Sequence, residues 1–178
     1  TMLRLGTESS VIRAIAEHGA ARRAAIGSEN VFDFSIGNPS VPPPPAVADV
    51  LRRLLTEEDP VVLHGYTSAV GDLATRQAIA NDLNRRFDTD IVPGELFIGC
   101  GAAPELTAVF RALAVPGGEI LAVAPFFPEY RPFVESAGLT FKAVAPDVPN
   151  FQIRLDALAD AITENTQAII VNSPNNPA

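Results

Sequence analysis

The sequence predicts an α/β protein of three layers, in which helices cover both faces of a mainly parallel sheet, preceded by an N-terminal helical segment. From residue 95 onward, short apolar runs alternate regularly with amphipathic segments. This alternation is typical of strands joined by crossover helices. Within 104–113 the apolar residues also recur at i, i+3, i+4 and i+7, which indicates a helix with one face packed on the sheet.

The elements of this regular part follow in chain order. Strands are predicted at 95–99, 119–124, 140–145 and 168–172, and helices between them at 104–113, 129–137 and 155–162. Before them, residues 9–26 have helical spacing of apolar residues and stop before Gly27. Residues 31–36 alternate like a short strand, and four prolines at 42–45 then favour an extended connector. Further helices are predicted at 46–57 and 71–87, with an irregular loop between them.

Composition narrows the classes of function. The chain has 178 residues, 47% of them hydrophobic, with a formal net charge of -8 and a pI near 4.7. An acidic chain is a poor match for nucleic acid or an anionic membrane, because both require clustered Lys and Arg. No signal peptide or long apolar run is recognisable, so a cytoplasmic location is expected. Cys100 is the only cysteine and has no partner at metal-ligand spacing, so no metal site is predicted.

Polar residues follow the last predicted strand. Asn172, Asn175 and Asn176 come directly after an apolar run, at the carboxyl end of the strand. Open α/β sheets bind their ligands at this edge, so these amides are candidate ligand contacts. Asn and Pro are also ordinary turn formers, and a plain turn is the alternative.

The turn at Gly101, Ala102 and Ala103 is a second candidate site. It lies between a predicted strand and helix, with Pro104 suited to the first helical turn. Free amides at a helix N-terminus with no bulky side chain nearby can bind an anion. A tight turn that needs small residues for packing explains the same pattern.

Several aromatic and reactive side chains each have an ordinary explanation. The aromatics of "APFFPEY" are either core residues or a platform for a flat cofactor. Tyr66 and His64 are consistent with surface-loop residues, and Cys100 is expected to be a small buried thiol. The aromatics concerned are Phe126, Phe127 and Tyr130.

Taken in order, five stretches resemble the class I/II aminotransferases, which are pyridoxal 5'-phosphate enzymes of the aspartate aminotransferase fold. They are "FSIGNPSVPPP", "GYTSAVGDLATRQAIA", "CGAAPELTAVFRAL", "APFFPEYRPFVESAG" and "VNSPNNPA". They run from about residue 32 to the end and fit the N-terminal half of such an enzyme. On this resemblance, 1–45 is an N-terminal helix and connector of a small domain or dimer arm. Residues 46–178 are then the first part of the cofactor-binding large domain, truncated at its C-terminus.

The resemblance implies roles for particular residues. The turn at Gly101, with the amides of Ala102 and Ala103, would hold the cofactor phosphate, and Phe127 would lie against the pyridine ring. Asn176 would hydrogen-bond the ring oxygen and also face the substrate, where Gly37 would lie beside the substrate carboxylate. Tyr66 would reach the phosphate of the other subunit, which implies a homodimer.

The resemblance also implies that the principal catalytic group lies beyond Ala178. Such enzymes hold the cofactor as a Schiff base on a lysine, and the only lysine here is Lys142, in predicted strand 140–145. Its position favours a solvated lysine near a sheet edge. The Schiff-base lysine, the acid facing the pyridine nitrogen and the carboxylate-binding arginine are therefore expected after residue 178, and this chain alone is expected to be inactive.

Three functions remain open. The first is transfer of an amino group from an amino acid to a 2-oxo acid. The second is a carbon–sulfur β-lyase, because the same scaffold and cofactor support elimination, and fold alone does not separate the two. The third is a ligand-sensing domain of a transcription regulator. A nucleotide-binding domain is disfavoured because neither G-x-G-x-x-G nor a P-loop is present.

Overall fold

The computed structural model describes residues 11–35, 37 and 41–176. They divide into two units, one ending at Ala69 and the other beginning at Val70. These two units do not test the domain boundary expected after residue 45, which stays a prediction.

The first unit is helical. α2 (Val11–Ile26) and α3 (Pro45–Glu57) confirm the helices predicted at 9–26 and 46–57, so far as they are described. α3 begins with Pro45, whose missing N–H costs nothing in the first turn. A short helix, α4 (Pro60–Leu63), lies within the stretch predicted as a loop. Asp59 caps it by accepting a hydrogen bond from the Val61 amide at 2.7 Å. This cap favours a helical turn although Val61 and Val62 are β-branched.

The strand predicted at 31–36 is wrong for its described residues, 31–35, which follow the one-turn helix η1 (Ser28–Asn30) and pair with no strand. Side-chain contacts hold this segment instead. Asp33 accepts hydrogen bonds from Arg23 of α2 at 2.6 Å and from the Ser35 hydroxyl at 2.6 Å. The alternation of apolar and polar residues correctly indicated an extended segment. The segment is not a strand, because no neighbouring strand is available to form a hydrogen-bonded ladder with it.

The second unit begins with α5 (Leu73–Phe87), which confirms the helix predicted at 71–87. Asp72 caps it by accepting from the Thr75 amide at 2.8 Å. The strand predicted at 95–99 is wrong, because the chain forms the one-turn helix η2 (Pro93–Glu95) and then an irregular segment. The Ile98 amide bonds to the Val70 carbonyl at 3.1 Å, and no described strand lies beside it to extend this contact into a ladder.

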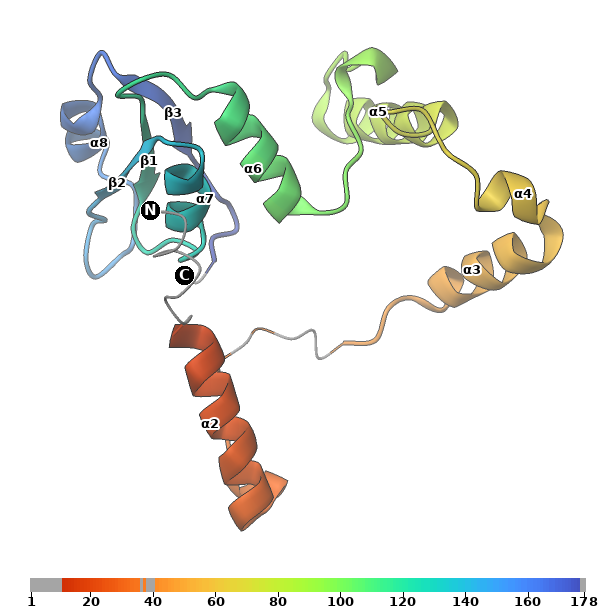
Figure 1. Cartoon of the computed structure of the whole chain (residues 1–178), viewed down its shortest axis with the longest axis horizontal. Helices are drawn as coiled ribbons and strands as arrows, with labels where there is room; N and C mark the ends of the chain where they lie inside the picture. Colours follow the sequence, from red (N-terminus) through yellow and green to blue (C-terminus); the bar gives the residue numbers. More distant parts are fainter. Residues whose placement is uncertain (1–10, 36, 38–40, 177–178) are drawn as a thin grey trace. The chain divides into compact units, whose positions relative to one another are not determined.

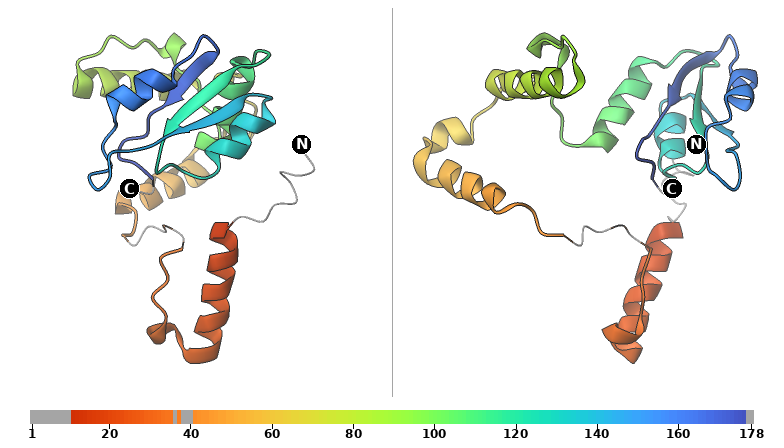
Figure 2. Two further views of the ribbon diagram at one scale, coloured as in Figure 1. Left: turned by 90° about the vertical axis from the view of Figure 1, so that its left-hand side faces the viewer. Right: turned by 180° about the vertical axis from the view of Figure 1, so that it is seen from behind.

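A three-stranded parallel sheet and its connecting helices form the rest of this unit. β1 (Glu119–Val123), β2 (Thr140–Val144) and β3 (Thr166–Ile170) pair in the order β2-β1-β3. The predicted crossover helices are also present, as α6 (Ala102–Ala112), α7 (Tyr130–Ser136) and α8 (Leu155–Ala161). Figures 1 and 2 show α7 and α8 on opposite sides of the sheet. The predicted α/β class with a parallel sheet is confirmed.

The main core lies between this sheet and helices α6 and α7. Ile120 and Ala122 of β1 pack with Phe141 of β2, Phe110 of α6 and Val134 of α7, and all five are buried. Leu121 is equally buried and points to the opposite face, because side chains alternate along a strand. The core therefore fixes β1 at the centre of the sheet, and with it the edge at which all three strands end. No helix among the described residues combines the length and apolar character needed to span a membrane.

Candidate active site

A cavity of about 600 Å³ lies at the carboxyl edge of the sheet. The ends of β1 and β3 form its floor, and one wall comes from Phe126 and Tyr130, which follow β1. The loop 150–153 before α8 forms another wall. Parallel strands place their carboxyl ends at one edge, so segments far apart in sequence meet there.

The asparagine segment is tied to the aromatic segment across this cavity. Asn175 donates from Nδ2 to the carbonyl oxygen of Pro125 at 2.9 Å, and the Asn176 amide donates to Oδ1 of Asn175 at 2.9 Å. Asn172 and Asn175 both line the cavity. Asn176 is exposed beside it and does not contribute to the lining. Asn175 therefore does more than form a turn, because its side chain joins two of the stretches that carry the family resemblance.

The aromatics of the second segment belong partly to the core and partly to the site. Phe127 packs against the core, and its ring meets that of Tyr130 edge to face, with centroids 5.6 Å apart at 80°. Phe126 meets Phe141 in the same manner at 4.9 Å. Phe126 and Tyr130 line the cavity, whereas Phe127 lies beside it.

The turn before α6 leaves the first amides of the helix without a side-chain cap. Gly101 has φ 118° and ψ 166°, a conformation that only glycine adopts without strain, and α6 begins at the next residue. No side chain caps this helix, and the Ala102 and Ala103 amides make no hydrogen bond to the described part of the chain. The three residues are exposed and lie outside the cavity lining. Cys100 is exposed as well, so its expected burial is wrong, because the irregular segment before it joins no sheet.

Two predicted site residues belong to the other unit. Tyr66 follows α4 and is fully exposed, and Gly37 is exposed with no atom within 4 Å of the position a Cβ would take. Their roles stay predictions.

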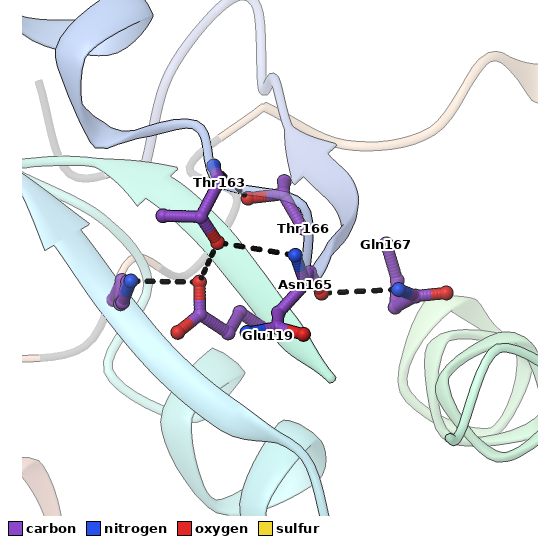
Figure 3. Close-up of polar contacts among 6 residues, drawn as sticks. Glu119, Thr163, Asn165, Thr166 and Gln167 are labelled. Carbon is purple, nitrogen blue, oxygen red and sulfur yellow. Dashed lines mark hydrogen bonds and ion pairs between the residues drawn. The ribbon is translucent and has the colours of Figure 1, made fainter. Parts of the chain in front are cut away.

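Lys142 is held at the edge of the sheet opposite the cavity. Its Nζ donates to Oε2 of Glu119 at 2.7 Å, and Thr163 donates to the same oxygen at 2.8 Å, as Figure 3 shows for Glu119 and Thr163. These contacts lower the pKa of Glu119, chiefly through the hydrogen bond from Lys142. Glu119 begins β1 and Thr163 precedes β3, so the ammonium group points to the amino ends of the strands.

The loop 147–153 is part of the site that the sequence did not reveal. The Asp147 amide bonds to the Gln152 carbonyl at 2.9 Å, and Phe151 adopts a left-handed conformation with φ 54°. Phe151 and Ile153 then line the cavity. A left-handed phenylalanine has no sequence signal, because its conformation is imposed by the surrounding turn. Across the described ranges, no three His, Cys, Asp or Glu side chains gather as a metal site would require.

Comparison with solved structures gives the same architecture. An aminotransferase from Eubacterium rectale superposes with a TM-score of 0.95 at 47% identity, over 99% of this chain and 45% of its own. Thermus thermophilus aspartate aminotransferase, as a double mutant, superposes with a TM-score of 0.86 at 25% identity, over 100% of this chain and 45% of its own.

Sequence comparison agrees. The chain is 31% identical to an aspartate aminotransferase of Thermotoga maritima over 150 residues, which are 84% of this chain and 39% of the relative. It therefore spans less than half the length of the relatives it matches. The sequence pattern of the family described as "Aminotransferase class I and II" matches residues 29–178. The chain belongs to the class I and II aminotransferases.

Proposed function

We propose that the whole protein is a pyridoxal-phosphate-dependent aminotransferase that moves an amino group from an amino acid to a 2-oxo acid. The observation that carries this proposal is the hydrogen bond from Asn175 to Pro125. It joins the asparagine and aromatic segments of an aminotransferase at the carboxyl edge of a parallel sheet, where α/β enzymes bind their ligands.

The residues before α6 fit the phosphate of this cofactor. The Ala102 and Ala103 amides are uncapped at the N-terminus of an 11-residue helix, where the helix dipole favours a negative charge. A Cβ on Gly101 would meet no atom within 4 Å, so the approach to the turn is open. We infer that Phe127 faces the pyridine ring and that the Asn176 side chain bonds the ring oxygen. When bound, the cofactor supplies an electron sink for bond breaking at the amino acid.

Substrate and subunit contacts extend this proposal to the first unit. We infer that Gly37 and Asn176 face the substrate and that Tyr66 contacts the phosphate of a second subunit in a homodimer. The exposure of Tyr66 and Gly37 supports these roles. A cytoplasmic location is proposed with them.

The lysine that carries the cofactor is proposed to follow Ala178, so that residues 1–178 alone do not transaminate. Lys142 is the only lysine of the chain, and its ammonium group is engaged by Glu119 at the amino ends of the strands. The acid facing the pyridine nitrogen and the carboxylate-binding arginine are proposed to follow as well.

A carbon–sulfur lyase is the second candidate. The S-alkyl-thiohydroximate lyase of Arabidopsis thaliana is 29% identical over 159 residues, which are 84% of this chain and 33% of that protein. A ligand-sensing domain of a regulator is the third, and no contact in the described residues favours it.

Replacement of Ala102 by Asp in the full-length protein tests the cofactor site. A carboxylate at this turn should repel the phosphate and weaken pyridoxal phosphate binding about tenfold or more, or about 1.4 kcal/mol, measured by absorbance titration. Ala102→Asn is the control, because it has nearly the same shape without the charge. Equal affinity of the Asp variant and the wild type would remove the phosphate assignment. Transfer to a 2-oxo acid, against thiol release from a thioether amino acid, separates transaminase from lyase.

A further inference from the structure

We propose that Tyr130 is a positioning residue for the bound cofactor. Its ring packs against Phe127 and orients it, and its hydroxyl forms a hydrogen bond with pyridoxal phosphate at the cavity. The inference rests on the function proposed above and adds a residue to its site.

Tyr130 is a buried side chain with an unused polar group. It is 8% exposed and belongs to the main core cluster. Its hydroxyl makes no hydrogen bond to any described residue. A buried tyrosine hydroxyl ordinarily has a partner, because burial without one costs free energy. A phenylalanine would fill the same core position without that cost.

Tyr130 is also one of the residues that line the cavity. In the described part of the chain (11–35, 37 and 41–176), Oε2 of Glu129 is the one buried side-chain oxygen or nitrogen that is shielded from solvent and has no hydrogen-bond partner. The Tyr130 hydroxyl is also unbonded, so it must retain contact with solvent. Because Tyr130 lines the cavity at the carboxyl edge, the proposed contact places its hydroxyl toward that cavity.

The chemistry of the lining makes this hydroxyl a useful contact. No residue that lines the cavity carries a formal charge, and its polar side chains are amides and hydroxyls. Asn175 already donates to Pro125, and Asn150 donates to Asp147 within its own loop. The free phenol of Tyr130 therefore remains available to a ligand as donor or acceptor.

The ring of Tyr130 links this hydroxyl to Phe127. The two rings meet edge to face, and the Tyr130 amide bonds to the Phe127 carbonyl at 3.0 Å, so one turn fixes both residues. A ligand that contacts Phe127 and the Tyr130 hydroxyl would meet two groups held in one geometry. Such preorganisation strengthens binding, because fewer side chains lose conformational freedom when the ligand binds.

Tyr130→Phe in the full-length protein is the test, because it removes the hydroxyl and retains the ring. Pyridoxal phosphate affinity is measured by absorbance titration, the bound cofactor by its visible circular dichroism, and apo-protein stability by thermal unfolding. We expect affinity to fall roughly threefold to tenfold, as for loss of one hydrogen bond, with a changed spectrum. The melting temperature of the apo-protein should be unchanged or slightly higher.

Thr163→Val is the matched control, because it removes a hydroxyl that serves the sheet. It should lower the melting temperature and leave cofactor affinity unchanged. Wild-type affinity and spectrum in Tyr130→Phe would overturn the inference, and so would a fall in apo-protein stability with unchanged affinity. A wild-type protein without a cofactor band would instead contradict the proposed function itself.

Discussion

Asn175 and Pro125 are 50 residues apart in sequence, yet the Asn175 side chain donates to the Pro125 carbonyl at 2.9 Å. Pro125 follows β1 and Asn175 follows β3, and the two strands are direct neighbours in the sheet. The pairing of β1 with β3 therefore brings the two segments to one edge, and the side-chain bond holds them together.

Asn175→Ala should loosen this edge with a small effect on overall stability. The lost hydrogen bond is exposed, so we expect a cost of about 1 kcal/mol or less in chemical denaturation, with a clear loss of cofactor affinity. Asn165→Ala is the matched control, because the Asn165 side chain makes no hydrogen bond to the described residues. Equal cofactor affinity in both variants would contradict a role for this contact in the site.

Gly101→Ala should destabilise the protein through the backbone alone. A Cβ at this position meets no atom within 4 Å, but φ 118° and ψ 166° are unfavourable for alanine, at a cost of roughly 1–3 kcal/mol. Gly94→Ala is the control, because its Cβ also meets open space and its φ is not positive. Denaturation midpoints compare the two, and equal stability would show that the turn relaxes without strain.

Lys142→Met should retain the covalent link to the cofactor. Lys142 is bonded to Glu119 at the amino ends of the strands, so its loss should cost stability while a lysine elsewhere still bonds pyridoxal phosphate. Borohydride reduction of the full-length protein, followed by peptide mapping, identifies the labelled residue. A label on wild-type Lys142, or no label in Lys142→Met, would overturn the lysine assignment.

Asp33 should give the first unit an acid-sensitive contact. Hydrogen bonds from Ser35, together with Arg23, lower the pKa of Asp33 from 3.8 to about 2. A lowered pKa means that the stabilisation is complete above about pH 4 and is lost as the pH falls toward 2. The stability difference between wild type and Asp33→Asn should therefore shrink over this range in pH-dependent denaturation. A difference that stays constant from pH 5 to pH 2 would contradict the contact.

The features of this protein that depend on local signals could be predicted from its sequence. Apolar periodicity identified helices α2, α3, α5, α6, α7 and α8, and apolar runs identified β1, β2 and β3. The order of the motifs identified the family, which the comparisons confirm. These features could be predicted because each is encoded by residues adjacent in the chain.

Which extended segments become strands, and which side chains meet, depends on how the whole chain packs. Residues 31–35 and 95–99 have strand-like sequence but no neighbouring strand, and a ladder requires a partner that local sequence does not supply. The bond from Asn175 to Pro125, the exposure of Cys100 and the wall around Phe151 depend in the same way on chain pairing over long separations. The unbonded hydroxyl of Tyr130 could not be predicted from the sequence either, because burial and the absence of a partner are properties of the packed chain.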